Sequence, residues 1–475
     1  MNRHITATLT LLLAISQCTV AQPALTLEKC RMLALENNKK LRIAEAEKIA
    51  AHHERRAAST SYLPRIDANA LYMHNSHKTV LLDSDSRRVL ENIGSSLGEE
   101  IKEIATIFPA IQQLAQSGFV TSLDRLGSSI SDALTLDTRN ILAGTISAIQ
   151  PIYAGGKISA YNRLTVIAEK ISHYNYEATK QDILLTTEEA YWQVVSLSYK
   201  EQLATSYLKL TQSFLDDAKK IERQGMATKA ELLSINVKVN EAGMAHLEVK
   251  NGLALARILL NHICGLPLDS TVVLYDETEF TVEPAVTIRN ATIENRPELY
   301  ALESVRDATY QQTRIVRSDF LPTIVLTGGY AISNPSITDG FRRKFEGTWN
   351  IGVVLKIPVW NWGEGYDKIK ASKARSTIAI YTLDNVHQEM QMQLQQQLKK
   401  VSETNGRLAL AESNIKMAEE NLRNTNLSFN EGMATVQEVM EAQTAWIKAH
   451  SSLIDAKIDI MLSQARLRRA TGTLE

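Results

Sequence analysis

The sequence of 475 residues is poor in the residues that interrupt regular structure. It contains only 21 glycines and 10 prolines. Because both residues destabilise helix interiors, their scarcity favours long helices. No segment after the first 21 residues has 18 apolar residues in a row, which excludes a membrane-spanning helix. Membrane strands remain open, since they are short and alternate in polarity.

Charge of one sign and catalytic motifs are also missing. The 52 basic and 53 acidic residues give a net charge of −1, and no basic face predicts a nucleic-acid partner. Ser413–Lys416 matches Ser-x-x-Lys, but it lies inside a predicted helix without partner motifs. Ala154–Lys157 (AGGK) lacks the spacing of a phosphate loop, and the ten histidines are scattered. We therefore expect no enzyme, no cofactor and no metal site.

The first 21 residues are typical of an export signal. Arg3 supplies the positive charge, Ile5–Ile15 is a short apolar core, and Thr19–Ala21 offers small residues for cleavage. Two other interpretations stay open: a buried first helix, and a lipoprotein acylated at Cys18.

The remaining chain consists of two copies of one unit. Gln224–Thr228 (QGMAT) returns as Glu431–Thr435 (EGMAT), 207 positions later. Upstream, Leu63-Pro64 returns as Leu321-Pro322 at an offset of 258. The 51-residue difference indicates an insertion in the first copy. The predicted domains are a signal peptide (1–21), a first repeat (22–265), a linker (266–286) and a second repeat (287–475).

Each repeat reads as a helix, two strands, a very long helix and a returning helix. The predicted elements of the first copy are Leu27–Ser59, 64–74, 141–150, Lys157–Arg223 and Lys229–Cys264. Those of the second copy are Val286–Arg317, 322–332, 348–357, Glu364–Asn430 and Val436–Arg469. The insertion, at about 75–140, falls between the first two strands and contains an amphipathic segment. A helix of 67 residues spans roughly 100 Å, so such helices must pack side by side as coiled coils.

The strands alternate between apolar and polar residues. In the last strand Trp349, Ile351 and Val353 share one face, while Asn350 and Gly352 share the other. Such a sheet either covers a soluble core or faces lipid with its apolar side. The export signal and aromatic residues near the strand ends favour lipid. Four strands cannot close a barrel, so the chain must associate with copies of itself, and three copies give twelve strands.

The whole pattern resembles the TolC family of outer-membrane efflux factors. Ala34–Ala46 and Ile293–Ser304 resemble its first-helix motif, and Phe429–Gln443 (FNEGMATVQEVMEAQ) resembles its periplasmic turn. The strand entries YLPRI and FLPTI, the transitions QPIYAGGK and IPVWNWGE, and the ending LRRATGTLE are also similar to the family's. The resemblance covers the mature chain except the insertion.

The resemblance implies a mainly α fold with a small β part. Three chains would form a twelve-stranded outer-membrane β-barrel, with four strands per chain, continuous with a long α-helical coiled-coil tunnel in the periplasm. The expected partners are two further copies, outer-membrane lipid, a periplasmic adaptor (membrane fusion) protein and an inner-membrane pump of RND, ABC or MFS type. The expected location is the outer membrane, extending into the periplasm.

The resemblance also assigns candidate residues for a periplasmic gate. Two carboxylates of the family, six and nine positions after the turn glycine Gly432, correspond to Glu438 and Glu441, and a third that pairs with them corresponds to Glu231. Three copies would form carboxylate rings, in which like charges raise the pKa and favour cations. Solvated charges at a helix tip are the alternative.

Other family positions differ here or serve different roles. A gate tyrosine is replaced by Phe429, and a gate arginine by Ala434, so the closed state must rest on other contacts. The adaptor-docking turns correspond to Gly225, Met226, Gly432 and Met433. The strand-to-helix transitions correspond to Pro151 and Pro358. Cys30 and Cys264, the two mature cysteines, are predicted near the equatorial collar and would form either a disulfide or two buried thiols.

We therefore expect an outer-membrane exit channel of a tripartite efflux pump, which passes substrates from an inner-membrane transporter and adaptor to the outside. The alternatives are the outer-membrane duct of a type I protein secretion system and a non-channel exported trimeric coiled-coil scaffold or adhesin.

Overall fold

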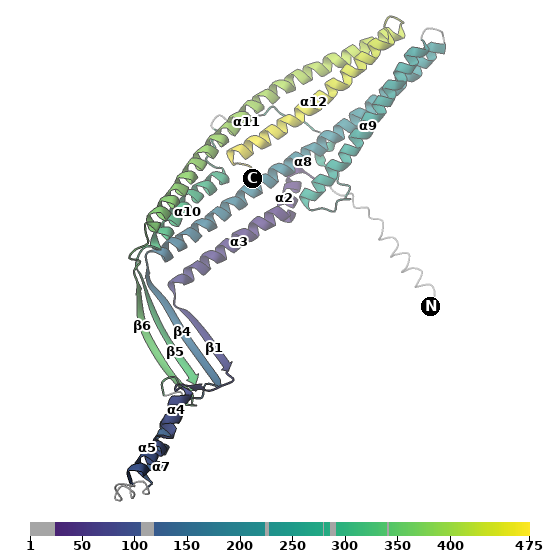
Figure 1. The fold of residues 1–475 in the computed structure, drawn as a ribbon. Coiled ribbons are helices and arrows are strands. Elements are labelled where there is room, and N and C mark those ends of the chain that lie inside the picture. Colours follow the sequence, from purple (N-terminus) through teal and green to yellow (C-terminus); the bar gives the residue numbers. More distant parts are fainter. Residues whose placement is uncertain (1–23, 106–117, 224–227, 279, 286–290, 340–341) are drawn as a thin grey trace, which may run out of the picture. The chain divides into compact units, whose positions relative to one another are not determined.

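The protein is described by a computed structural model that covers residues 24–105, 118–223, 228–278, 280–285, 291–339 and 342–475 (Figure 1). The predicted signal peptide and Cys18 lie outside the described residues. The fold is mainly α with a small β part, as predicted. The chain divides into two compact units: a helical unit within residues 1–55, 163–310 and 373–475, and a sheet unit within residues 56–162 and 311–372.

Long helices dominate the chain. They are α2 (Leu27–Asn37), α3 (Lys39–Ser59), α8 (Lys157–Arg223), α9 (Lys229–Cys264), α10 (Pro297–Ser318), α11 (Glu364–Asn430) and α12 (Val436–Thr471). Helices α8 and α11 have 67 residues each, and α9 and α12 have 36 each. The offset of 207 in the sequence therefore reappears as two equivalent pairs of helices.

The ends of the two returning helices have the same local cause. Helices α9 and α12 begin after Thr228 and Thr435, each of which forms a capping box with a glutamate three residues later. They end at Gly265 and Gly472, whose φ angles of 70° and 73° are left-handed. A Cβ on Gly265 would lie 2.3 Å from the Asn37 Cβ, so glycine is also required there by space.

Two predicted helices differ from the structure. The segment Leu27–Ser59 forms two helices rather than one, because Asn38 is extended and its side chain accepts a hydrogen bond from the Lys40 amide (2.9 Å). Of the helix predicted over Val286–Arg317, residues 286–290 lie outside the described residues, and α10 begins at Pro297, since proline is suited to the first helical position and lacks the amide that a helix interior needs.

Each half of the helical unit has its own apolar core. In the first, Tyr191 and Trp192 of α8 pack with residues of α2 and α9. In the second, Val401 of α11 and Ile460 of α12 are fully buried. The described part of the linker 266–286 contains the short 3₁₀ helix Tyr275–Glu277, and its Leu274 pairs with Leu25 in a parallel bridge. Its residue Phe280 lies against Trp192.

The sheet unit contains four long antiparallel strands: β1 (Arg65–His74), β4 (Asn140–Ala154), β5 (Thr323–Asn334) and β6 (Glu346–Lys356). Their order is β1-β4-β5-β6, so the two repeats join at the β4–β5 pair (Figure 1). Strands β1 and β6 are the two edges of the sheet, and each offers a row of backbone groups for further pairing.

The register places most of the large apolar residues of the four strands on one face, while Leu71, Met73, Ile149, Val325 and Val354 lie on the other. Ile66 pairs with Ala148, Ala148 with Gly328, and Gly328 with Ile351, and directly paired residues point to the same side. This face also carries Tyr330 and its partner Trp349, the latter 74% exposed. A row of large apolar side chains is thus open to the surroundings within the single chain.

The strand-to-helix transitions differ between the repeats. Pro151 does not end a strand as predicted: β4 continues to Ala154 with an irregularity after Pro151, and the chain turns at Gly155 and Gly156 (φ 59° and 83°). A Cβ on Gly155 would lie 2.8 Å from the Ser318 carbonyl oxygen, so the turn tolerates no side chain there. Pro358 does lie in its transition, between β6 and α11.

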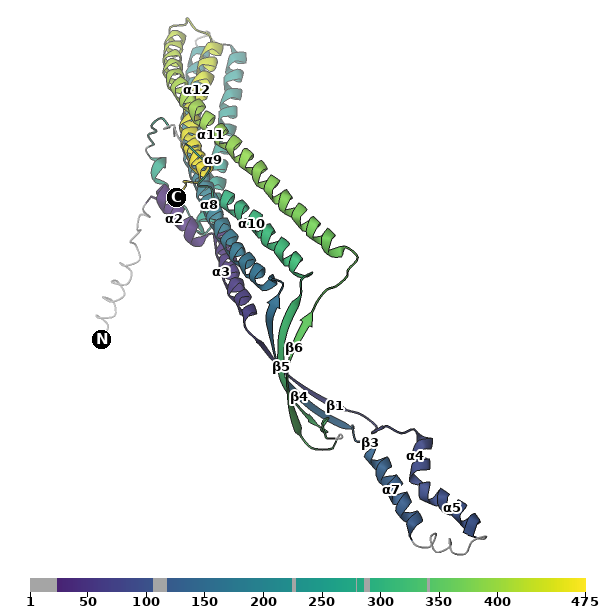
Figure 2. The same ribbon diagram turned by 90° about the vertical axis from the view of Figure 1, so that its left-hand side faces the viewer.

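The insertion forms a helical hairpin between β1 and β4, whose paired residues His74 and Asn140 mark its limits. It contains the short pair β2 (Thr79–Val80) and β3 (Thr135–Leu136), and the helices α4 (Ser84–Glu91), α5 (Ile93–Ala105) and α7 (Phe119–Ala133). Figure 2 shows these three helices following the end of the strands.

Candidate functional site

The helix tips carry most of the residues that the sequence singled out. At the second tip, α11 ends at Asn430 and Gly432 adopts a φ of 72°. The Gly432 amide donates to the Phe429 carbonyl (3.0 Å) and the Met433 amide to the Ser428 carbonyl (2.8 Å), so the turn is closed by its own backbone. The side chain of Met433 is 76% exposed. Gly225 and Met226 of the first tip lie outside the described residues.

Glu231 and Glu438 close the first turns of the returning helices. The Thr435 amide donates to Glu438 Oε2 (2.6 Å), as does the Thr435 hydroxyl (3.0 Å). Glu231 makes the same two bonds with Thr228, at 2.7 and 2.8 Å. The backbone amide and then the hydroxyl of each threonine hold the pKa of these carboxyls below the ordinary value. This effect opposes the rise that crowding in a threefold ring would cause.

Phe429 packs the helix pair α11 and α12 against the helix pair α8 and α9. Its ring lies 5.1 Å from that of Phe214 on α8, at 62°. Around this pair, Leu215, Ala218, Ile235, Val436 and Val439 form a buried group that we term the tip cluster. Phe429 is thus a packing residue between the halves of one chain.

A groove beside the tip cluster brings two of the candidate glutamates together. This tip groove has a volume of about 710 Å³ and is lined by Ala230, Glu231, Ser234, Lys238, Thr435, Val436, Gln437, Met440, Glu441 and Thr444. Its walls are the equivalent ends of α9 and α12. Glu441 accepts a hydrogen bond from Gln437 (3.0 Å), and Lys238 pairs with Glu241 (3.2 Å). The groove is therefore an exposed surface of mixed charge at the end of the helical unit.

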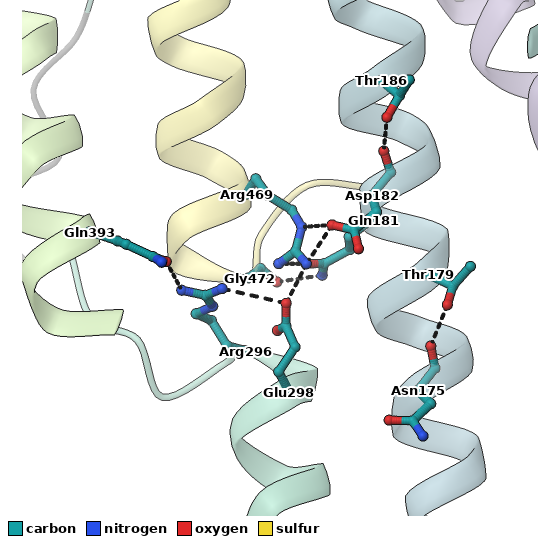
Figure 3. Close-up of polar contacts among 10 residues, drawn as sticks. All are labelled: Asn175, Thr179, Gln181, Asp182, Thr186, Arg296, Glu298, Gln393, Arg469 and Gly472. Carbon is teal, nitrogen blue, oxygen red and sulfur yellow. Dashed lines mark hydrogen bonds and ion pairs between the residues drawn. The ribbon is translucent and has the colours of Figure 1, made fainter. Parts of the chain in front are cut away.

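A second set of polar residues, which the sequence did not reveal, lies where α12 ends. We call it the buried charge cluster; it consists of Gln181, Asp182, Arg296, Glu298, Gln393 and Arg469 (Figure 3). Arg469 contacts Asp182 (2.7 Å) and Glu298, and Arg296 donates to Gln393 (3.1 Å). Gln181 donates to the Gly472 carbonyl (3.0 Å).

The electrostatics of this cluster are balanced by pairing. Burial raises the pKa of Glu298, but the hydrogen bond and charge of Arg469 outweigh it, and the net pKa is lowered. The side chain of Arg469 is only 10% exposed, whereas that of Asp182, at the edge of the cluster, is 64% exposed. The cluster connects α8, α10, α11 and α12, so it fixes helices of both repeats to one another.

A neighbouring buried carboxylate extends this connection to the N-terminal helix. Glu188 on α8 is 1% exposed and binds both Arg31 of α2 and Arg468 of α12 (3.3 Å). The signal for it in the sequence is weak: a glutamate at a position of α8 whose neighbours are buried. Charges paired across helices far apart in the sequence have no periodic pattern.

Cys30 and Cys264 are brought together, but the disulfide is not formed. Both are fully buried free thiols, and the Cys264 Sγ lies 3.7 Å from the Cys30 carbonyl oxygen. The hydrogen bond with Cys264 and then burial raise the pKa of the Cys30 thiol. The pair links the start of α2 to the end of α9.

Two kinds of feature are absent from the described residues. Within them, no group of three or more His, Cys, Asp and Glu side chains could hold a metal ion. None of the helices in the described parts of the chain combines the length and apolar character needed to cross a membrane.

The chain is similar in sequence to a known family and to several characterised proteins. The sequence model of the family described as "Outer membrane efflux protein" matches residues 105–266 and 288–473. The chain is 23% identical to the alkaline protease secretion protein AprF of Pseudomonas aeruginosa over 337 residues, which is 70% of this chain and 69% of that protein. It is 21% identical to the outer membrane protein TolC of Escherichia coli over 355 residues, 70% of each chain.

Solved structures share the fold. The CmeC outer membrane channel of Campylobacter jejuni superposes with a TM-score of 0.73 and 18% identity, over 94% of this chain and 86% of that one. The MtrE outer membrane channel of Neisseria gonorrhoeae, in its open state, gives 0.70 and 16%, over 94% and 89%.

Proposed function

Because the chain belongs to the outer membrane efflux protein family, we propose that it is a homotrimeric exit channel of a tripartite efflux pump. As a member of this family it is an outer-membrane protein that extends into the periplasm. In the proposal, each chain gives four strands to a twelve-stranded barrel, and the long helices continue the barrel as a tunnel.

The open sheet is the observation that carries the proposal. Its apolar face is exposed, and β1 and β6 leave both edges free to pair. An unpaired edge in lipid costs several kcal/mol for each backbone group. Pairing β6 of one copy with β1 of the next removes every edge and turns the apolar face to lipid, while Asp67, Asn69 and Asn350 face a water-filled interior.

The oligomeric state tests this step. Native mass measurement of protein extracted from outer membranes in detergent should give three chains per particle. Monomers, or a soluble periplasmic pool, would contradict the proposal.

The helix tips are the proposed contact with the other components. We propose that the turns around Gly225, Met226, Gly432 and Met433 dock a periplasmic adaptor (membrane fusion) protein, which is joined to an inner-membrane pump of RND, ABC or MFS type. A photoreactive residue at Met433 should cross-link to such an adaptor in intact cells. The same residue at Leu410, also exposed but in the middle of α11, serves as the control. Equal labelling at both positions would count against tip docking.

A type I protein secretion duct is the second candidate, and the similarity to a protease secretion protein favours it. Deleting the gene for this chain from its host distinguishes the efflux function from the secretion function. Loss of small-molecule resistance with secreted proteins unchanged supports efflux, whereas loss of one secreted protein with resistance unchanged supports secretion.

A further inference from the structure

The two longer helices of the insertion pack together through glycines. A Cβ on Gly94 would lie 2.1 Å from the Val120 carbonyl oxygen, and one on Gly98 would lie 3.1 Å from the Val120 side chain. Gly127 of α7 makes the same kind of contact with α4, where a Cβ on Gly127 would lie 1.9 Å from the Leu90 carbonyl oxygen. Gly94 approaches Asp124, and Gly98, one turn later on α5, approaches Val120, one turn earlier on α7. The two helices are therefore antiparallel. Their backbones approach closely, so the hairpin is a compact unit.

A second face of the same hairpin is apolar and exposed. On α7, Phe119, Leu126 and Ile130 are 45%, 58% and 41% exposed, and their spacing of seven and four is that of a coiled-coil stripe. On α5, Ile93 and Leu97 are exposed at a spacing of four. We call these five residues the apolar stripe.

The stripe forms one continuous surface. Successive residues of an α-helix are rotated by about 100° around its axis. In both helices the stripe residues therefore lie about a quarter to a third of a turn before the residues that form the contact between the helices. Because α5 and α7 run in opposite directions, the same rotation places both halves on the same side of the hairpin. The position of the glycine contacts along the two helices also places Ile93 of α5 beside Leu126 of α7.

We propose that the apolar stripe binds the same hairpin of neighbouring copies, so that three insertions associate above one end of the barrel and narrow its outer mouth. This inference rests on the trimeric channel proposed above. The insertion leaves the sheet at the paired residues His74 and Asn140, so closing a barrel from three chains brings three hairpins to one mouth.

The charges bordering the stripe fit a neighbouring copy. Glu99 and Glu100 flank it on α5, and Arg125 lies beside it on α7; all three are exposed. A contact from α5 of one copy to α7 of the next joins opposite charges. Such a head-to-tail contact is the kind that threefold symmetry closes into a ring.

Mixed-copy cross-linking in the full-length protein tests the inference. Chains with Leu97→Cys and chains with Leu126→Cys are co-expressed under different tags and treated with a bifunctional maleimide. A band that carries both tags can only join two copies. The matched control uses Ser96→Cys and Ser129→Cys, which lie on the exposed polar sides of the same helices. We expect the mixed-tag band for the stripe pair and no such band for the control pair.

A second readout does not depend on cross-linking. The double variant Leu126→Glu/Ile130→Glu should increase the conductance of the channel, whereas Ser122→Glu/Ser129→Glu should leave it unchanged. Trimers that show no mixed-tag band, or whose stripe cysteine is joined instead to a cysteine of a different protein, overturn the inference and leave the channel intact. Monomers overturn both.

Discussion

A glutamate closes the first turn of each returning helix, and this changes how the predicted gate residues act. Glu231 and Glu438 are held by the threonines that cap their own helices. Glu441 is outside the capping box and lines the tip groove. Glu438 is therefore held by the cap of its helix, while Glu441 is bonded to Gln437 one turn away, and both are exposed.

Loss of the threonine cap should loosen the tip. Thr435→Ala removes the hydroxyl that bonds the Glu438 amide (3.3 Å), and such caps contribute about 1 kcal/mol. Hydrogen exchange in the first turn of α12 should accelerate by roughly fivefold. Glu441→Ala is the control, and its exchange should match the unchanged protein. Equal acceleration in both variants would show that the cap contributes nothing.

The same cap sets a pH dependence. Since the pKa of Glu438 in the folded chain lies below its ordinary value of 4.5, the cap is complete above pH 4.5 and is lost as pH falls through the lowered pKa. We expect cation selectivity from a ring of Glu438 to persist below pH 4.5, and Thr435→Ala to lose it at higher pH. Reversal potentials in a KCl gradient measure both. Loss of selectivity at the same pH in the two proteins would mean that ring crowding dominates.

At the scale of elements, buried charge pairs rather than apolar contacts alone join the helices of the two repeats. Arg469→Ala would leave Glu298 with Arg296 alone (3.4 Å) and would remove the ion pair of the exposed Asp182, and losing such a partner costs a part-buried charged group about 1–3 kcal/mol. Urea unfolding followed by circular dichroism should show this loss.

Arg466 offers a matched control for that experiment. It lies three residues away on α12 and pairs with the exposed Glu189 (2.8 Å), so Arg466→Ala should cost less than about 1 kcal/mol. A similar loss in both variants would show that burial of the Arg469 cluster has no special energetic weight.

The insertion is an element that the sheet does not need. Strands β5 and β6 pair without an equivalent, and the β1–β4 register reaches His74 and Asn140 on its own. Replacing residues 80–138 by a short Gly/Ser link should leave the yield of trimers unchanged. Native mass measurement checks this, and a protein that stays monomeric after the deletion would contradict it.

At the scale of the molecule, the repeat predicted the fold well because its boundaries are written in local chemistry. Thr228 and Thr435 begin helices, Gly265 and Gly472 end them, and the bounds of α8, α9 and α11 match the prediction. The break at Asn38 was missed because asparagine is tolerated inside helices, and only its side-chain bond to the Lys40 amide reveals the end of α2.

The candidate site was predicted less completely. The tip residues follow from the turn motif, and Glu231 and Glu441 do line one groove. Neither the packing of Phe429 on Phe214 nor the buried charge cluster could be read from the sequence. Both depend on which faces of helices distant in the sequence meet, and that is decided by the packing of the two halves.

The central claim is that three chains form one water-filled pore. Conductance of the purified trimer in a planar bilayer tests it most directly. We predict stepwise currents of uniform size that favour cations and disappear when the protein is dissociated by heating. Trimers of the correct native mass that insert into the bilayer and carry no current would contradict the account.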